Sequence, residues 1–307
     1  MKNNILDIKG IKVGHCENKQ ARTGVSVILV ENGAVCGVDV RGSAPGTRET
    51  DLLNPINTIE KVHALVLSGG SAFGLASATG VMNYLEEREI GFDVGVTKVP
   101  IVPAAVLFDL ANGEAHIRPD EKMGYQACEN ASDTHLPEGD VGAGCGARVG
   151  KILGMQNSCN SGIASFAKTT ESGITVAAIV AVNAFGDVLK DGEIIAGAKD
   201  EQGNFANSAK VLQGMFSQPK FSGQNTTIGL IATNVALTKS QATKVASMAH
   251  DGLARSISPV HTTLDGDTLF CLSTCEKELE NAPVDLIGIM ACEVLEKAVV
   301  RAVEVCE

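Results

Sequence analysis

The stretch GQNTTIGLIATNVAL, residues 223–237, decides the fold of this chain. Polar residues end at Asn225, and from Thr226 onward the sequence is apolar and rich in β-branched residues, which indicates a buried strand. Residues 189–225 are polar without a sustained period, so we expect an exposed connector with at most one short helix. The junction therefore joins a connector to a buried strand that starts with a hydroxyl side chain.

This arrangement is what a self-cleaving N-terminal nucleophile requires. After cleavage between Asn225 and Thr226, the threonine would carry both its Oγ and a free α-amine. An α-amine titrates at roughly pH 7.7–8.0, so it can accept the hydroxyl proton without a separate histidine base. The alternative interpretation is that Asn225-Thr226 is only the entry to a strand.

The elements around the junction alternate between strands and helices. Residues 25–31 and 34–40 are β-branched runs separated by Asn32-Gly33, a turn signal that predicts a hairpin. A strand at 64–68 leads into a predicted helix from Ser71 to about residue 87, whereas residues 113–140 are polar and predicted to form a loop.

Two further helices are predicted after the buried strand. Thr238 with Gln241 forms a capping-box signal, and Pro283 opens a last helix at its first turn. Blocks of strands and helices in one chain of 307 residues predict a layered α+β fold in a single domain, residues 1–307.

Composition excludes several classes of function. The net charge is −11 and no run of Lys or Arg occurs, so binding to nucleic acid or to an anionic membrane is not expected. The N-terminus lacks the apolar region of a secretory signal, which predicts a cytoplasmic protein. The nine cysteines are an odd, scattered set, and we expect reduced, mostly buried thiols.

Several motifs that resemble catalytic or binding sites fail on spacing. Gly69-Gly70-Ser71 lacks the second glycine of a nucleophile elbow, because Phe73 occupies its position. The glycine-rich stretch 142–151 lacks the pattern of a phosphate loop, so we expect close backbone packing with Lys151 emerging at its end. The six histidines show no metal-binding spacing, and neither a metal nor a cofactor is predicted.

Longer motifs run through the whole chain in order: IKVGH (11–15), VRG (40–42), PGTRETD (45–51), SGGSAFGL (68–75), VPAA (102–105), VGAG (141–144) and VNA (182–184). In this order they resemble the L-aminopeptidase/D-esterase (DmpA-type) family of N-terminal-nucleophile hydrolases. The resemblance implies a DmpA/ArgJ-like four-layer αββα sandwich. It also implies self-cleavage into an α chain, 1–225, and a β chain, 226–307, with a homotetramer of processed αβ units.

Within that family, the chain is most similar to the endo-type 6-aminohexanoate-oligomer (nylon oligomer) hydrolases. That branch has Asn before Thr, as in Asn225-Thr226, and an Asp-x-Asp pair, as in Asp265-Gly266-Asp267. The similar β-aminopeptidase branch has a serine nucleophile and a Ser-x-Glu pair instead.

The resemblance also assigns roles to single residues. Lys151 and Asn183 correspond to a site cation and an amide donor, and a carboxamide suits stabilisation of an oxyanion. On a strand, Asp265 and Asp267 would share one face and could orient the Thr226 ammonium or a nearby lysine; the alternative is a hairpin turn at Asp265-Gly266. Some members place a tyrosine where this chain reads Val106-Leu107-Phe108-Asp109, so no phenol role is assigned.

The sequence therefore predicts a cofactor-free, self-processing amide hydrolase (an aminopeptidase or an amino-acid-oligomer amidase) that works through an acyl-enzyme on Thr226. Its substrate would be an N-terminal peptide bond or an amide of a linear ω-amino-acid oligomer. One alternative is acyl transfer to an amine, as in the similarly folded ornithine acetyltransferases. Another is an uncleaved, non-enzymatic binding protein on the same scaffold.

Overall fold

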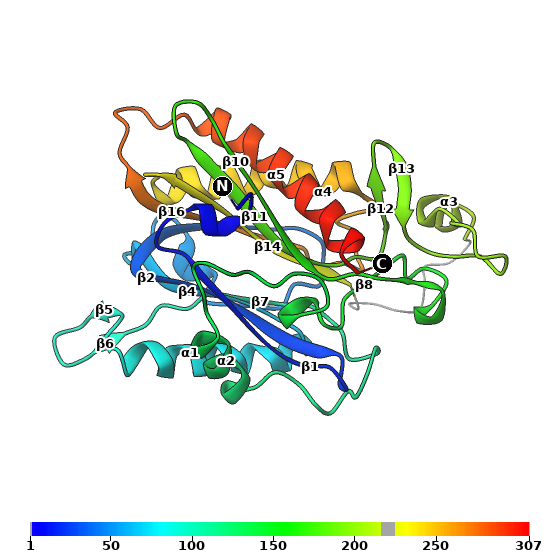
Figure 1. The fold of residues 1–307 in the computed structure, drawn as a ribbon, viewed down its shortest axis with the longest axis horizontal. Helices are drawn as coiled ribbons and strands as arrows, with labels where there is room; N and C mark the ends of the chain where they lie inside the picture. Colours follow the sequence, from blue (N-terminus) through cyan, green and yellow to red (C-terminus); the bar gives the residue numbers. More distant parts are fainter. Residues whose placement is uncertain (1, 216–224, 307) are drawn as a thin grey trace.

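The structure, a computed structural model, describes residues 2–215 and 225–306 (Figure 1). The helices are α1 (Ser77–Glu86), α2 (Glu121–Glu129), α3 (Ser208–Gln213), α4 (Lys239–Ser256) and α5 (Val284–Glu304). The strands are β1 (Lys12–Asn18), β2 (Thr23–Val40), β3 (Thr47–Arg48), β4 (Lys61–Ser68), β5 (Phe92–Asp93), β6 (Lys98–Val99), β7 (Ala104–Val106), β8 (Arg148–Val149), β9 (Cys159–Asn160), β10 (Ile163–Thr169), β11 (Thr175–Asn183), β12 (Asp187–Lys190), β13 (Glu193–Ala196), β14 (Thr226–Val235), β15 (Ile257–Ser258) and β16 (Thr268–Lys277).

One large mixed sheet organises the described residues. Its strand order is β10-β11-β14-β16-β2-β4-β7-β3, and β1 also pairs with β2. β14 and β16 run parallel to each other at its centre, while β11 and β2 flank them in antiparallel orientation.

The long strand β2 belongs to two halves of this sheet. Its first part pairs with β1 and β4, and its last part pairs with β16. The predicted hairpin at Asn32-Gly33 is therefore wrong: the pairing with β4 is irregular between Leu29 and Ala34, and Gly33 has a φ of +76° there. A turn signal inside a long β-branched run marks a bend of one strand here, because each part of the strand has its own partners.

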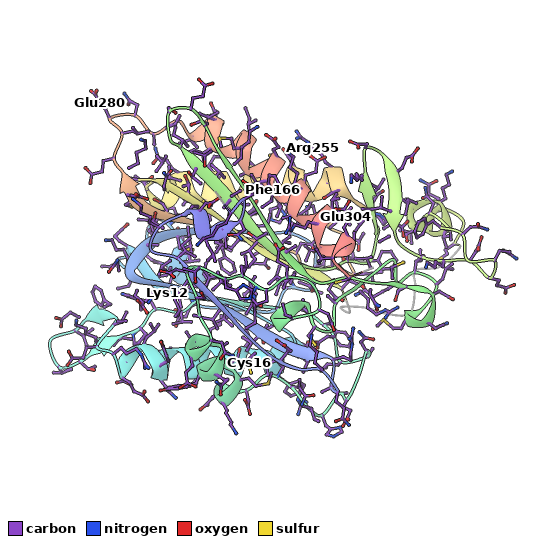
Figure 2. All side chains as sticks on the ribbon, viewed as in Figure 1. Lys12, Cys16, Phe166, Arg255, Glu280 and Glu304 are labelled. Carbon is purple, nitrogen blue, oxygen red and sulfur yellow. The ribbon has the colours of Figure 1, made fainter. Side chains whose placement is uncertain are left out.

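The two halves of the sheet face each other across a shared apolar core. Ile28 and Leu65 from one half belong to the same buried cluster as Leu230 and Phe270 from the other. The side chains in Figure 2 fill the interior, whereas charged side chains such as Glu280 lie at the periphery.

Helices cover both outer faces. α4 and α5 pack on the half that contains β11, β14 and β16, and α1 and α2 pack on the half that contains β2 and β4 (Figure 1). The order of layers is helices, sheet half, sheet half, helices. The predicted α+β class and the four-layer αββα sandwich are confirmed.

The boundaries around the junction were predicted well. β14 begins at Thr226, and α4 has the capping box of Thr238 and Gln241. The predicted helix from Ser71 starts as a 3₁₀ segment, Ser71–Ala76, before α1 begins.

Two loop predictions need correction. Residues 113–140 contain α2, whose first turn is capped by the Asp120 carboxylate accepting from the amide of Met123 at 2.9 Å. The expected connector contains β13 and the end of β12 besides the short helix α3, and its residues 216–224 lie outside the described residues. Within the described ranges, no helix combines the length and the apolar character needed to cross a bilayer.

Candidate active site

Thr226 opens β14 in the interior of the sheet. Asn183, the last residue of β11, is its partner on the neighbouring strand. Asn225 and Thr226 are each only 3% exposed, and the threonine hydroxyl donates to the carbonyl oxygen of Asn225. The hydroxyl thus contacts the peptide bond that the sequence predicts to be cleaved, and this bond is buried instead of exposed.

The carbonyl oxygen of Asn225 has a second donor. The backbone N–H of Gly266 donates to it at 3.1 Å, and Asn225 forms an isolated parallel bridge with Asp265. A backbone amide in this position can stabilise negative charge that develops on the oxygen when the carbonyl carbon is attacked.

Lys151 reaches this region from the end of the glycine-rich stretch 142–150. Its Nζ donates to Oδ1 of Asn183 at 2.8 Å and to the carbonyl oxygen of the same residue at 2.9 Å. Burial lowers the pKa of Lys151 to about 7, although the negative charge of Asp265 opposes that shift. A lysine with such a pKa can lose a proton as the ammonium and accept one as the neutral amine near neutral pH.

Close packing of a glycine places Lys151. Gly150 has a φ of +70°, and a Cβ at this residue would lie 2.0 Å from the backbone nitrogen of Ala198. The Lys151 amide then donates to the carbonyl of Phe185 at 3.1 Å, which brings the lysine beside the end of β11. The predicted close backbone packing of this stretch is confirmed at this position.

The Asn183 carboxamide is held at both ends. Its oxygen also accepts from the amide of Arg148 at 3.1 Å, and its Nδ2 donates to the carbonyl of Phe108 at 2.8 Å. One amide hydrogen of the side chain is therefore used inside the protein, which fixes the plane of the group. The contact with Phe108 links the two halves of the sheet at the site.

Asp265 and Asp267 precede β16 instead of lying on a strand, which corrects the prediction that a strand places both carboxylates on one face. Asp265 accepts from the hydroxyl and the amide of Thr262 at 2.6 and 3.1 Å and from the amide of Phe185 at 3.3 Å. Burial and the nearby charge of Asp267 raise the pKa of Asp265 to about 6. Its charge therefore changes within the range where many enzymes work.

Asp267 binds the backbone next to the candidate nucleophile. Its Oδ1 accepts from the amide of Thr227 at 2.7 Å, and its Oδ2 accepts from Nδ1 of His261 at 2.7 Å. The alternative of a simple hairpin turn at Asp265-Gly266 does not describe this geometry. His261 was not predicted from the sequence, because a histidine six residues before an aspartate has no motif that separates it from other histidines.

The residues after β2 hold the backbone of both aspartates. Arg41 donates its amide to the carbonyl of Asp267 at 2.8 Å, and the amides of Ser43 and Ala44 donate to the carbonyl of Asp265 at 2.8 and 3.0 Å. Gly42 has a φ of +85°, and a Cβ there would lie 2.2 Å from the Asp265 oxygen. The VRG motif thus supplies a close-fitting backbone support for the pair.

Asp109, a further buried carboxylate with no role predicted from the sequence, lies near enough to Lys151 for their charges to interact. It is 3% exposed, and its Oδ1 accepts from the amide of Gly70 at 2.7 Å. Burial raises the pKa of Asp109, while the charge of Lys151 lowers it. The Gly69-Gly70-Ser71 stretch is thus a turn that Asp109 holds, as its failed nucleophile spacing indicated.

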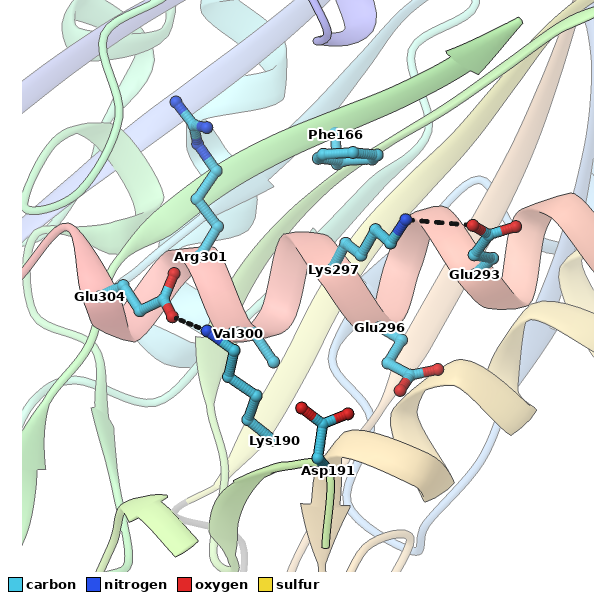
Figure 3. A pocket seen from close by; sticks show the side chains of 9 residues that line it. All are labelled: Phe166, Lys190, Asp191, Glu293, Glu296, Lys297, Val300, Arg301 and Glu304. Carbon is cyan, nitrogen blue, oxygen red and sulfur yellow. Dashed lines mark hydrogen bonds and ion pairs between the residues drawn. The ribbon is translucent and has the colours of Figure 1, made fainter. Parts of the chain in front are cut away.

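The described residues contain no group of three or more His, Cys, Asp or Glu side chains arranged to hold a metal ion. A surface pocket of about 480 Å³ runs along α5 (Figure 3), and none of the predicted site residues lines it. Charged side chains line this pocket, including the ion pair of Lys190 with Glu304 and that of Lys297 with Glu293 along α5. The candidate active site is the cluster around Thr226, which the contacts described above bring together, and not this surface pocket.

Comparisons with known proteins agree over nearly the whole length. The family model described as peptidase family S58 matches residues 3–307. An uncharacterised aminopeptidase of Mycobacterium leprae is 42% identical over 337 residues, covering 99% of this chain and 91% of the relative. A 6-aminohexanoate-oligomer endohydrolase of Kocuria sp. is 30% identical over 312 residues, covering 97% of this chain and 85% of that enzyme.

Solved structures share the fold at lower sequence identity. A Pyrococcus horikoshii protein has a TM-score of 0.75 at 22% identity, covering 100% of this chain and 88% of the other. The L-aminopeptidase D-Ala-esterase/amidase of Ochrobactrum anthropi, described as a variant of the N-terminal-nucleophile (Ntn) hydrolase fold, has a TM-score of 0.74 at 17% identity. The match covers 99% of this chain and 86% of the Ochrobactrum anthropi chain.

Proposed function

The chain belongs to peptidase family S58, and from that premise we propose that it is a self-processing amide hydrolase whose nucleophile is Thr226. Its α chain would be residues 1–225 and its β chain residues 226–307. The contact of the Thr226 hydroxyl with the Asn225 carbonyl, whose oxygen also accepts from Gly266, carries this proposal. The contact supports the proposal, because a hydroxyl beside a carbonyl group can act as a nucleophile and a second donor on the carbonyl oxygen can stabilise an oxyanion.

Processing would begin with attack of Thr226 Oγ on the carbonyl carbon of Asn225. The C–N bond breaks, the acyl group moves to Oγ as an ester, and the amine of Thr226 receives the proton that leaves its hydroxyl. Water then hydrolyses the ester, which gives a carboxylate on Asn225 and restores the hydroxyl. In the uncut chain no free α-amine exists, so Lys151, whose pKa burial lowers to about 7, is the proposed carrier of this proton.

Turnover would use the same hydroxyl on a substrate amide. The free amine of Thr226 takes the hydroxyl proton as Oγ attacks, and the leaving amine of the substrate receives a proton as the C–N bond breaks. Water then releases the acyl group from Oγ. Asn183 and Lys151, which contact each other at 2.8 Å beside Thr226, would hold the developing charge.

Intact mass of the purified protein tests the processing step. We expect the wild type to give two pieces of about 23 and 8.5 kDa, from the share of residues in each. Thr226→Ala should give one chain of 31.8 kDa, because it removes the nucleophile. Thr226→Ser keeps a hydroxyl and serves as the matched control, which should still divide.

A single uncut mass for the wild type would favour the non-enzymatic binding protein instead. Cleavage at the same bond in Thr226→Ala would show that another group is the nucleophile.

We propose linear amides with a free amino end as the substrate class. The names of two relatives, an uncharacterised aminopeptidase and a 6-aminohexanoate-oligomer endohydrolase, support this class. Hydrolysis of 6-aminohexanoate oligomers and of short peptides by the processed protein, followed by mass spectrometry, compares the two substrates. Both activities should be lost in Thr226→Ala.

A further inference from the structure

His261 lies in the segment between β15 and β16 and binds one carboxylate of the site. Its Nδ1 is 2.7 Å from Oδ2 of Asp267, and its backbone N–H is 3.3 Å from the same oxygen. The ring is 17% exposed and the carboxylate 1%. His261 has a φ of +54°, a conformation that is uncommon for residues with a side chain. The surrounding structure therefore holds the ring in place against a local backbone cost.

A second histidine packs on the other side of this ring. The rings of His250 and His261 meet edge to face, with centroids 4.8 Å apart and planes at 72°. Nε2 of His250 lies 3.1 Å from the carbonyl of Asp39, whose carboxylate accepts from Arg41 at 3.2 Å. Burial lowers the pKa of His250 to about 4, so this neighbouring ring is neutral at neutral pH.

The contact between His261 and Asp267 assigns the donor and the acceptor. An ionised carboxylate only accepts hydrogen bonds, so Nδ1 of His261 is the donor to Asp267. The other oxygen of Asp267 accepts from the amide of Thr227 at 2.7 Å. One carboxylate therefore connects the ring of His261 to the second residue of β14.

We propose that His261 is a positioning residue: it fixes the Asp267 carboxylate so that the start of β14, and with it Thr226, stays aligned for attack. This inference rests on the proposed function. The ring does not touch the reacting atoms and acts only through Asp267. The hydrogen bond from the ring restricts rotation of the carboxylate, whose Oδ2 would otherwise be held only by the longer, 3.3 Å contact with the backbone N–H of His261.

The test compares variants of His261 whose new residues all tolerate its left-handed backbone conformation. His261→Asn and His261→Asp both tolerate the left-handed conformation, but only asparagine keeps a donor for Asp267. His261→Gly also tolerates it and removes the side chain. Each variant is produced by cell-free translation, and the fraction of cut chain is followed by intact mass from pH 6 to pH 9. His116→Gly, in an exposed loop, controls for loss of a histidine.

We expect His261→Gly and His261→Asp to slow self-cleavage by about ten- to a hundredfold, the range for losing a hydrogen bond to a charged group. His261→Asn should stay within about threefold of the wild type, and His116→Gly should match it. Rescue by asparagine relative to glycine tests for the donor, whereas aspartate, which has the shape of asparagine, combines the loss of the donor with a second negative charge beside Asp267. Thermal melts of the four variants confirm that the comparison is made on folded protein.

Wild-type rates in His261→Gly and His261→Asp would overturn the positioning role and leave the proposed function intact. An asparagine variant as slow as the aspartate variant would also overturn it, because the donor would then be irrelevant. A wild type that never divides would overturn the proposed function and, with it, this inference.

Discussion

Lys151 is the residue that couples this site most directly to pH. Its Nζ binds two oxygens of Asn183, and burial lowers its pKa to about 7. A lowered lysine pKa means that the neutral form, which can accept a proton, predominates above pH 7. If the lysine accepts the hydroxyl proton, self-cleavage must become faster as pH rises through that value.

We predict that the self-cleavage rate of the wild type increases between pH 6 and 8 with a midpoint near pH 7, as set by Lys151. Lys151→Arg keeps the positive charge but cannot lose it, so it should cleave at least about a hundredfold more slowly, the usual contribution of a general base. Time courses of intact mass at each pH measure both. A Lys151→Arg variant with the rate and midpoint of the wild type would exclude this role.

A second prediction for a single residue concerns the carboxylate of Asp265. Asp265 has a pKa raised to about 6, and a carboxylate near the free amine of Thr226 favours the ammonium form. Asp265→Asn removes the negative charge that favours the ammonium form of Thr226, and it removes a group that itself titrates near pH 6. Both effects should move the acidic limb of kcat/KM to lower pH. The pH profile should be measured on processed protein, with cleavage verified by mass, and with Asp251→Asn on the exposed face of α4 as the control. A limb that stays in place or moves upward would contradict the prediction.

Single residues show what sequence could and could not locate. Thr226, Lys151, Asn183, Asp265 and Asp267 were predicted from motifs that resemble a family, and the structure brings them together. Their roles stay predictions, as do the homotetramer and the cytoplasmic location. His261 could not be found, because its contact depends on how the segment before β16 folds back on Asp267.

At the scale of elements, the backbone after β2, which holds the carbonyl of Asp265, can be tested with a matched pair of glycine variants. Gly10 and Gly42 both have a φ of +85°, but a Cβ would meet nothing within 4 Å at Gly10 and would lie 2.2 Å from the Asp265 oxygen at Gly42. Gly10→Ala should cost about 1–2 kcal/mol of backbone strain. Gly42→Ala should cost about 1–3 kcal/mol more from the steric contact.

Denaturation midpoints in the uncut Thr226→Ala background measure this difference without a mixture of cut and uncut chains. In the wild-type background, only Gly42→Ala should slow self-cleavage, because it displaces Asp265. Equal stability of the two glycine variants would show that the backbone around Gly42 relaxes freely.

Local signals predicted the elements whose partners are near in sequence. The capping box of α4 and the start of β14 were correct, since each depends on a few adjacent residues. The predicted hairpin at Asn32-Gly33 was wrong, because the residues on either side of it pair with β1, β4 and β16 and not with each other. The short helix α2 was missed because polar residues and a glycine, Gly124, occupy most of its nine positions.

At the scale of the whole molecule, the proposed β chain supplies the centre of the sheet. β14 and β16 lie between β11 on one side and β2 on the other, and both flanking strands belong to the proposed α chain. The two proposed pieces would carry net charges of −6 (19 basic and 25 acidic residues) and −5 (6 basic and 11 acidic residues), so attraction between opposite net charges would not hold them together. Buried strand pairing and apolar packing would.

We therefore predict that the two pieces of processed protein co-elute from a sizing column in 1 M salt. Electrostatic attraction is screened beyond about 3 Å at that ionic strength, whereas apolar packing is not weakened. Mass spectrometry of the eluted peak identifies both pieces. Separate elution in salt would mean that the central strands are not shared as the sheet order indicates.

The position of Gly266 has a consequence for the timing of synthesis. A ribosome makes Asn225 and Thr226 before it makes Gly266, whose amide binds the Asn225 carbonyl, and before β16, which fixes the neighbouring Asp267. Under the proposed chemistry, a nascent chain cannot divide until this later part has emerged and inserted between β14 and β2. The cut would then record that synthesis has passed β16, and products truncated before Gly266 would remain in one piece.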